Sequence, residues 1–177
     1  MIELPPFGGS FRNVTINGGV TGMGLNLGVV DDSIKGRQEA SSKPVRDKTW
    51  NWFIDDFFSR FANDAGLLVI MTRWHVDDLL GRALERFHDF KVLRYEAIAS
   101  QEERHFYRGR WIERHKGEPL FAAGWTKTDT GKIIRHVPWK PLDFLLERKQ
   151  ALSDASWASL YQQDPYIVGG GVLPSGC

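Results

Sequence analysis

Two short apolar runs stand out in the pattern of hydrophobic and polar positions along the chain. Residues Leu25–Val30 and Leu67–Met71 are mostly apolar and are bounded by polar residues. Runs of this length predict buried strands of the kind found in parallel sheets. The first run ends in Asp31-Asp32 and the second leads into Thr72-Arg73. Each strand is therefore expected to deliver polar side chains at its carboxyl end.

Further strands and several helices follow from the periodicity of the rest of the chain. Phe11–Ile16 and Lys91–Ile98 alternate like strands, and Asn17-Gly18-Gly19 is a turn signal. Apolar residues at helical spacing and suitable first residues predict four helices: Pro44–Phe61, Asp77 or Asp78 to about Phe87, Pro141–Leu152, and Asp154 to Gln163. The intervening polar stretches predict loops or turns: Ser33–Ser42, Asn63–Gly66 and residues 101–140.

The order of these elements is strand, helix, strand, helix, strand. This order predicts an α/β fold with a mostly parallel sheet flanked by helices. Ligands of such sheets bind beyond the carboxyl ends of the strands. Asp31, Asp32, Thr72 and Arg73 follow two strand ends of this kind, so they are the first candidates for chemistry.

Composition narrows the class of protein. The 177 residues, 42% hydrophobic and 25% charged, predict one soluble globular domain. Seven Trp and eleven Phe need thick layers or a partner surface to bury them. The net charge of +1 confines any DNA-binding surface to a local patch. The single Cys177 excludes a disulfide framework, and neither a membrane-length apolar run nor a signal pattern is present, so a reduced cytoplasmic setting is expected.

Asp31 and Asp32 suit a magnesium site. In phosphate-loop nucleotide hydrolases, an acid at the end of an apolar strand holds Mg²⁺, and a second acid orients or deprotonates the attacking water. Successive side chains of a strand point in opposite directions, so two adjacent acids can take two roles. The same pattern also occurs as a plain strand followed by an Asx turn. The residues alone leave both interpretations open.

Thr72 and Arg73 allow a similar pair of interpretations. A hydroxyl at a strand end can sense a phosphate or the attacking water, and an arginine can pair with phosphate or a carboxylate. Alternatively, the threonine caps a turn and the arginine makes a surface ion pair.

Two other groups of residues suggest chemistry less strongly. The acidic pairs, Asp55-Asp56 and Asp77-Asp78 among them, together with His75 suggest a metal-dependent nuclease, but Asp55-Asp56 fits a solvated helix stripe and no second histidine lies at metal-binding spacing. The stretch Arg104–Trp111 interleaves basic and aromatic residues, which suits nucleic acid. A solvated loop with inward-facing aromatic residues is the favoured interpretation of that stretch.

The sequence contains no Gly-x-x-x-x-Gly-Lys-Ser/Thr phosphate loop. Gly131-Lys132 is followed by Ile133 and lacks the upstream glycine. Within these residues, nothing is expected to cradle the β- and γ-phosphates of a nucleotide.

Four stretches, in order, resemble the large terminase subunits of tailed phages and prophages. Thr21-Gly22-Met23-Gly24 with the strand ending in Asp31-Asp32 resembles that family's glycine-containing loop and Walker B strand. Ile70–Arg82 resembles its "TRWH–DDL–GR" segment, Gly117–Leu120 its "GEALWP" stretch, and Trp157–Gly171 its "W…YQQ-P…GGG" close of the ATPase domain. Together they span nearly the whole chain.

The resemblance implies a part of a DNA-packaging motor. Residues 1–168 would be the C-terminal portion of the ATPase domain, with a partial phosphate-loop-type sheet, and residues 169–177 a Gly-rich linker toward a nuclease domain. Asp31 would bind Mg²⁺, Asp32 would activate water, and Thr72-Arg73 would couple hydrolysis to movement, with Gly22 and Gly24 helping to bind ATP. Many family members have Glu where Asp32 stands.

The partners that the resemblance implies are those of a packaging motor. They are double-stranded viral DNA, a portal protein on the procapsid, a small terminase subunit, and a separate chain that carries the phosphate loop; the setting is the host cytoplasm, without a membrane. Two alternatives stay open at this point: an inactive remnant of a truncated prophage gene, and a small metal-dependent nuclease.

Overall fold

The chain forms two compact units. The computed structural model describes residues 2–4, 8–16, 18–20, 22, 24–107, 109–120, 124–127, 130, 133–136 and 140–166. Unit 1 comprises Met1–Met71 and Asp77–His88, and unit 2 comprises Thr72–Val76 and Asp89–Cys177, whereas length alone predicts a single domain. In the described part of the chain, none of the helices has the length and apolar character needed to cross a bilayer. The predicted linker 169–177 lies outside the described residues.

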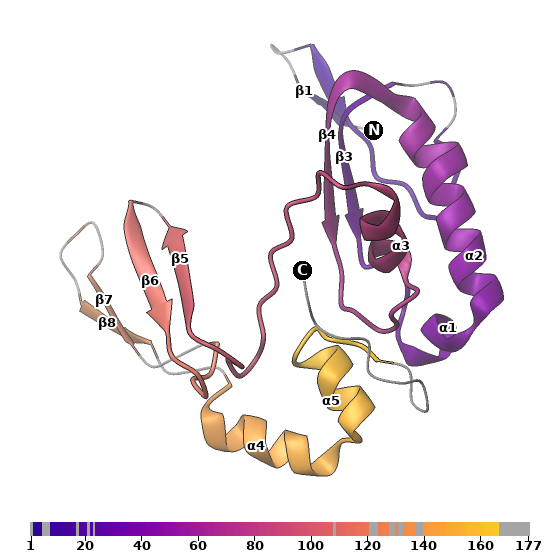
Figure 1. Ribbon diagram of the computed structural model, residues 1–177. Coiled ribbons are helices and arrows are strands. Elements are labelled where there is room, and N and C mark those ends of the chain that lie inside the picture. The colour runs from indigo at the N-terminus through magenta and orange to yellow at the C-terminus, as the bar shows by residue number, and fades with distance from the viewer. Residues whose placement is uncertain are drawn as a thin grey trace. The chain divides into compact units, whose positions relative to one another are not determined.

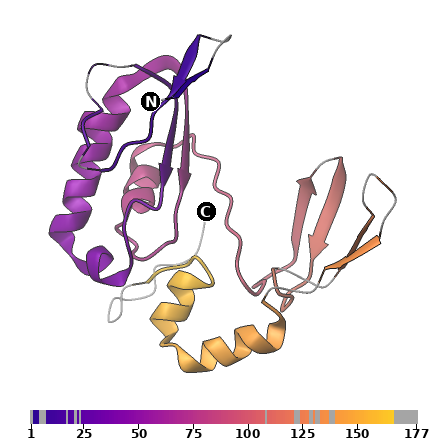
Figure 2. The same ribbon diagram turned by 180° about the vertical axis from the view of Figure 1, so that it is seen from behind.

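Unit 1 is built on a pair of parallel strands and the helical segment that connects them. Strands β3 (Leu25–Asp31) and β4 (Phe61–Ile70) pair in parallel, with Val30 opposite Val69 and Asp31 opposite Ile70. The connection contains α1 (Arg37–Ser41), α2 (Lys43–Asn51), a π-helical turn (Trp52–Phe57) and a 3₁₀ turn (Phe58–Arg60). Figures 1 and 2 show α2 alongside the two strands, with α3 (Leu79–Arg86) on the same side.

The core of unit 1 is largely aromatic and lies between the helices and one face of the strands. Its buried members are Val30, Phe53, Phe57 and Leu79. The Phe53 and Phe57 ring centroids are 6.0 Å apart, and Phe57 meets Phe61 edge to face at 5.3 Å. Each fully buried side chain of this size contributes about 1.5–3 kcal/mol. This cluster accounts for much of the aromatic content of the first half of the chain.

Gly28 lets the aromatic rings approach strand β3. A β-carbon at this position would lie 2.7 Å from Cζ of Phe57 and would also collide with Cζ of Phe61. Gly28 therefore makes room for the two rings in the middle of β3, where any larger residue would collide with them.

The opposite face of the strand pair is apolar and exposed. Leu27, Val29, Leu68 and Ile70 are each between 48% and 66% exposed. The sequence predicts parallel strands buried on both faces, but among the described residues this sheet has two strands and helices on one face only.

Several sequence predictions for unit 1 need correction. Asn63–Gly66 is not a turn but part of β4. Leu25 pairs with Phe61 and Leu27 pairs with Gly66, so β4 has three more residues than β3 between these two pairs. The extra residues form a β-bulge in β4. The predicted loop Ser33–Ser42 contains α1. The predicted strand Phe11–Ile16 is displaced to a hairpin of β1 (Ile2–Leu4) and β2 (Gly9–Phe11). Asn17 of the predicted turn lies outside the described residues, while Gly18 N donates to Thr15 O.

The helix beginning near Pro44, the strand Leu25–Val30 and the Asp78-capped helix are confirmed.

Unit 2 consists of two hairpins and two helices. Strands β5 (Glu103–Tyr107) and β6 (Arg110–Arg114) form one antiparallel pair, and β7 (Gly124–Lys127) and β8 (Ile133–His136) form the other. Helices α4 (Leu142–Ala151) and α5 (Asp154–Leu160) follow. The protein is therefore a mixed α/β structure whose described sheets are all two-stranded, one parallel and three antiparallel, and the prediction of a mostly parallel sheet was wrong for these residues.

Side-chain hydrogen bonds, together with single backbone bonds, connect the segments of unit 2. Arg114 donates two hydrogen bonds to Glu103, at 2.9 and 2.7 Å, and one to Glu96 O at 2.6 Å. The Gln162 amide donates to Ile98 O at 2.8 Å and accepts from Ile98 N at 3.2 Å. Gln162 belongs to one of the stretches that carry the family resemblance, and its observed role is to bridge the chain before β5 and the end of α5.

Corrections also apply to unit 2. Lys91–Ile98 does not form the predicted strand, since apart from a single bridge between Ile98 and Pro119 it makes isolated hydrogen bonds to neighbouring loops. Within the range 101–140, where loops are predicted, the described residues include two strand pairs: β5 with β6, and β7 with β8. Helix α5 is capped by Ser153, whose Oγ accepts from Ser156 N at 3.3 Å, not by Asp154. The helix predicted from Pro141 is confirmed as α4.

Candidate functional site

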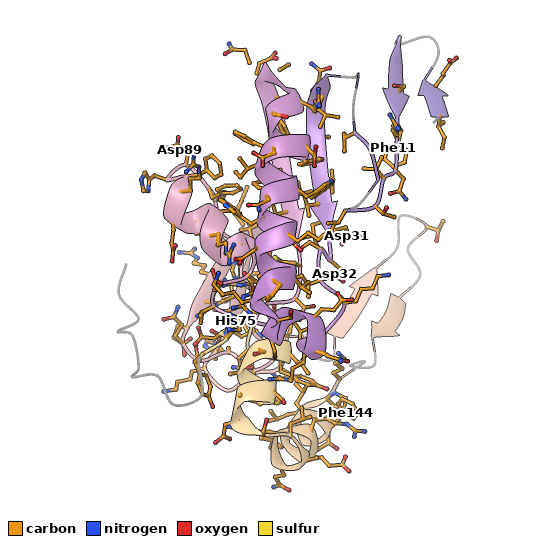
Figure 3. The ribbon with its side chains drawn as sticks, turned by 90° about the vertical axis from the view of Figure 1, so that its right-hand side faces the viewer. Phe11, Asp31, Asp32, His75, Asp89 and Phe144 are labelled. Atoms are coloured by element: carbon orange, nitrogen blue, oxygen red, sulfur yellow. The ribbon has the colours of Figure 1, made fainter. Side chains whose placement is uncertain are left out.

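Asp31 and Asp32 lie at the carboxyl end of strand β3. Asp31 is the last residue of the strand, and Asp32 N donates to Ile70 O at 2.9 Å, which extends the pairing with β4 by one bond. Asp32 then takes a left-handed backbone conformation with φ 41°. Aspartate tolerates this region better than most residues. Both acids are exposed, and Figure 3 shows them beside α2.

The turn after Asp32 buries a hydroxyl group. Ser33 is 8% exposed, and its Oγ has no hydrogen-bond partner among the described residues. An unmade hydrogen bond of this kind costs about 1–3 kcal/mol. The backbone N of Lys35 donates to Oε2 of Glu39 at 2.9 Å, which fixes the next part of the turn against α1.

These residues border a hollow between β3 and α2, here called the acid–lysine hollow. It has a volume of about 490 Å³, within the range of small-molecule sites. Its apolar lining residues are Val14, Ile16 and Val45, and its polar lining residues are Thr15, Asp31, Asp32, Ser33, Lys35, Glu39, Lys48 and Thr49. All of them belong to unit 1. The hollow therefore places two ammonium groups and a buried hydroxyl beside the two predicted acids.

The lysines and Ser33 are not among the residues that the sequence singled out. A signal for Lys48 was present, because Val45, Lys48, Thr49 and Trp52 lie at helical spacing in the predicted helix. Ser33 gave no signal, since burial of one hydroxyl in a polar stretch depends on how the chain turns.

The two predicted cofactor-binding glycines lie away from this hollow. Gly22 has φ +86°, a conformation that suits glycine, and Gly24 immediately precedes β3. Neither borders the acid–lysine hollow. The six steps of β3 between Leu25 and Asp31 span roughly 20 Å. Gly22 and Gly24 therefore do not meet Asp31 at one site in this structure.

Thr72 and Arg73 belong to unit 2. Both are half-buried; Arg73 N donates to Oε1 of Gln163 at 3.1 Å, and its guanidinium is 3.5 Å from Val76 O. Gln163 has a left-handed backbone, with φ 55°. The segment that follows β4 is thus held by a residue about ninety positions later in the chain. His75 lies in the same segment.

Asp77 and Asp78 have structural roles in unit 1. Asp78 is fully buried and caps α3 by accepting from Gly81 N at 2.9 Å. Asp77 accepts hydrogen bonds from Arg82, at 2.6 and 2.8 Å, and from Arg46 at 3.0 Å. These bonds, those from Arg82 above all, lower the pKa of Asp77 to about 2. The hydrogen bonds of Asp77 also connect α3 to α2. The nuclease interpretation gives Asp77 and Asp78 no such structural role.

The ion network continues through Asp47 on α2. Arg82 Nη2 donates to Asp47 Oδ1 at 2.7 Å, and Lys43 Nζ pairs with the other oxygen at 2.7 Å. The hydrogen bond from Lys43 and then that from Arg82 lower the pKa of Asp47, and the paired carboxylates raise the pKa of Arg82.

The carboxylates of Asp31 and Asp32 fit a hard cation that is bound together with a phosphate. No group of three or more His, Cys, Asp or Glu that could hold a metal ion occurs among the described residues. Mg²⁺ sites in nucleotide enzymes commonly use one or two carboxylates and complete the shell with phosphate oxygens and water. Two adjacent oxygen donors at a strand end match that requirement.

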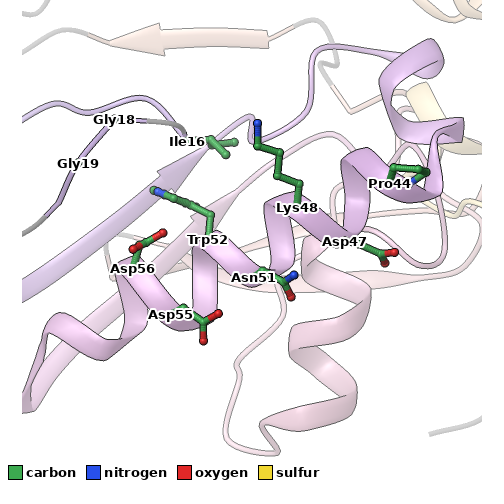
Figure 4. A pocket seen from close by; sticks show the side chains of 10 residues that line it. All are labelled: Ile16, Gly18, Gly19, Pro44, Asp47, Lys48, Asn51, Trp52, Asp55 and Asp56. Carbon is green, nitrogen blue, oxygen red and sulfur yellow. The ribbon is translucent and has the colours of Figure 1, made fainter.

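A second, larger hollow lies on the outer side of α2. It has a volume of about 720 Å³ and is bordered by Asp47, Lys48, Trp52, Asp55 and Asp56, among others. Figure 4 shows Lys48 rising from α2 toward the segment that contains Ile16, while Asp55 points away from it. Asp55 and Asp56 are exposed, as the sequence predicted. This hollow has no strand end on its border, so it is a weaker candidate for phosphate chemistry.

No protein-family model matches the chain, and no curated protein does.

Proposed function

We propose that this chain is part of the ATP-driven motor of a tailed-phage terminase large subunit, which packages double-stranded viral DNA into procapsids. The proposal rests on the ordered motifs in the sequence. The observation in its favour is the position of Asp31 and Asp32: they end a strand that runs parallel to β4, and they border a hollow of ligand size. In parallel α/β sheets this is the edge where ligands bind.

In this proposal, unit 1 is part of a phosphate-loop-type sheet. The exposed apolar face of Leu27, Val29, Leu68 and Ile70 supports that view, because parallel sheets usually carry cover on both faces. The phosphate loop itself is absent from these residues, so another polypeptide segment would supply it.

Asp31 would hold Mg²⁺ together with ATP. When bound, Mg²⁺ neutralises charge that develops on the phosphate oxygens. The Asp31 carboxylate, at the end of β3, would be one ligand of that ion. Asp32 would take a proton from the attacking water or orient it.

Thr72 and Arg73 would couple hydrolysis to movement of DNA. They follow β4 along the chain and their segment is anchored by Gln163. A segment outside helices and strands lacks a ladder of backbone hydrogen bonds, so it can take two positions more readily than a strand inside a sheet. The portal protein, the small terminase subunit and the procapsid in the host cytoplasm complete the proposed assembly.

Deletion of the reading frame from the phage or prophage genome that carries it tests this function. A packaging motor is needed after capsid assembly, so induced cells should accumulate DNA-free procapsids and unprotected DNA. Electron microscopy and DNase protection measure both. Normal yields of DNA-filled particles would reject the proposal and favour an inactive remnant.

A further inference from the structure

The hairpin of β5 and β6 contains the basic and aromatic stretch to which the proposed function gives no role. In the register of the two strands, Phe106 lies opposite Trp111. Two positions away along each strand, Arg104 lies opposite Glu113. Because strand side chains alternate between faces, these four side chains share one face, here called the outer face of the hairpin. Figure 1 shows the two strands side by side.

The opposite face of the hairpin is attached to the rest of unit 2. Arg114 is buried and donates to Glu96 O at 2.6 Å and to the Glu103 carboxylate at 2.7 and 2.9 Å. His105 lies on the same side, with its ring centroid 5.6 Å from that of Tyr95. These contacts determine which side of the hairpin packs against the protein, and they leave the outer face toward solvent.

Two aromatic rings are exposed on the outer face. Phe106 is 63% exposed and Trp111 is 55% exposed, and their ring centroids are 5.2 Å apart. The sequence favours inward-facing rings for this stretch, so the outward position of these two is a correction. Neighbouring exposed rings leave apolar surface in water that a ligand with flat apolar faces would cover.

Arg104 places a positive charge beside the rings. Its Cζ lies 4.3 Å from the Trp111 ring centroid, and its Nε is 3.3 Å from Glu113 Oε1. The Arg104 side chain is nevertheless 60% exposed, so it remains accessible to a ligand. A guanidinium held over a ring keeps N–H donors at the edge of the stack, where a phosphate oxygen can accept from them.

The charge of the hairpin favours a polyanion. Residues 103–114 contain four arginines and two glutamates, a net charge of +2, whereas the whole chain carries +1. Each of the two glutamates forms an ion pair with an arginine across the hairpin. The positive surplus therefore comes from the other two arginines of this stretch. A local excess of this kind is what a chain of nearly neutral net charge needs in order to bind nucleic acid.

We propose that the outer face of the hairpin binds single-stranded nucleic acid, with bases stacked on Phe106 and Trp111 and a phosphate in contact with Arg104. Unpaired bases have flat apolar faces, and the strand has the negative charge that the hairpin attracts. A duplex covers the faces of its bases within its own stack, so it does not suit this face. Stacking accepts every base, so binding should depend little on sequence.

This inference goes beyond the proposed function and does not rest on it. The packaging motor acts on double-stranded DNA, whereas the outer face concerns unpaired nucleotides and lies entirely within unit 2. Its test needs neither ATP nor a procapsid, so failure of either proposal leaves the other standing.

Fluorescence anisotropy of a labelled oligo(dT) of about twelve nucleotides, titrated with the full chain, tests the inference. Trp111→Leu keeps an apolar side chain but removes the ring, so it should weaken binding about tenfold or more. Trp111→Tyr keeps a ring and should bind within about threefold of the unmodified protein. Tyr166→Ala removes an exposed aromatic residue outside the hairpin and should bind normally. Circular dichroism and amide NMR spectra confirm that each variant is folded.

The salt dependence of binding tests the role of Arg104. Each phosphate contact contributes about 0.7 to the slope of the logarithm of the single-strand binding constant against the logarithm of the salt concentration. Arg104→Met should therefore reduce the slope by about 0.7, whereas Trp111→Leu should weaken binding with the slope unchanged. Arg148→Met is the matched control: Arg148 also lies over a ring, 4.9 Å from the Phe144 centroid, but belongs to α4. It should change neither the affinity nor the slope.

The inference is wrong if oligo(dT) does not bind at low salt, or if Trp111→Leu binds as tightly as Trp111→Tyr. Equal changes of slope in Arg104→Met and Arg148→Met would also overturn it. Binding of a duplex of the same length should be unaffected by Trp111→Leu, and an equal loss of duplex binding would contradict base stacking on this ring. A shift of Trp111→Glu toward monomer in sedimentation velocity, with unchanged oligo(dT) binding, would identify a second copy of the chain as the occupant and overturn the inference.

Discussion

Asp32 and Ser33 form the turn that follows strand β3. Asp32 turns the chain through a left-handed conformation, and the next residue is buried with its hydroxyl unbonded among the described residues. The apolar run before them predicted the strand and the position of the acids. It could not predict the burial of Ser33, because that depends on the helices that pack around the turn. The position of the two acids thus follows from the local sequence pattern, whereas the burial of Ser33 follows from tertiary packing.

At the residue scale, Gly28→Ala should lower the free energy of unfolding by about 1–3 kcal/mol. The added methyl group would meet the rings of Phe57 and Phe61, which form the core of unit 1 and cannot withdraw cheaply. Gly24→Ala is the control, since the nearest atom to its new methyl would be Arg60 O at 3.8 Å. Urea unfolding measures both variants, and equal stability of the two would contradict the packing described here.

At the scale of elements, ion pairs link α2 to α3 and to a residue that precedes α3. Arg46 and Arg82 converge on Asp77, and Arg82 also reaches Asp47. The sequence predicted α3 and its acidic cap because an Asp before an apolar helix is a strong local signal. It did not predict the partners of Asp77, which are Arg82, five positions later, and Arg46, 31 positions earlier in the chain. The same distinction explains β4, where pairing with β3 extended a strand through residues that locally favour a turn.

Asp77→Asn should lower the free energy of unfolding by about 1–2 kcal/mol at pH 6, after allowance for the 36% exposure of the carboxylate. The folded pKa of Asp77, about 2, lies below the ordinary value of 3.8, so its stabilisation is present above pH 4 and is lost as pH falls toward 2. The difference between the variant and the unmodified protein should narrow across that window.

Urea unfolding at a series of pH values measures this narrowing. Asp55→Asn, which removes an exposed acid from the π-helical turn, is the control and should have little effect at any pH. A difference for Asp77→Asn that stays constant from pH 6 to pH 2.5 would show that the carboxylate's charge does not stabilise the α2–α3 junction.

At the scale of the whole molecule, the α/β composition agrees with the sequence, whereas the extent of the sheet does not. Only β3 and β4 pair in parallel among the described strands, and their outer face is uncovered. Local periodicity identifies a strand but not the number of its neighbours, which is set by long-range pairing. In the proposed motor, further parts of the ATPase domain would cover Leu27, Val29, Leu68 and Ile70.

Exposed apolar sheet faces promote association. The isolated chain should therefore self-associate as its concentration rises, and Leu68→Lys should shift it toward monomer in sedimentation velocity experiments. Asn51→Lys adds the same charge at an exposed position on α2 and should leave the association unchanged. Identical behaviour of all three proteins would show that this face is not the site of contact.

The most direct test of the motor assignment is the amount of DNase-protected DNA made when Asp31→Asn is introduced into the phage or prophage genome. Removing one negative charge from a hard oxygen site should abolish packaging, and Asp32→Asn should reduce the packaging rate by about 10²–10⁴-fold if Asp32 is the general base. Asp56→Asn, an exposed acid outside the acid–lysine hollow, should package normally. Protected DNA at the unmodified level in Asp31→Asn particles would contradict the assignment of this strand end as the metal site of a packaging motor.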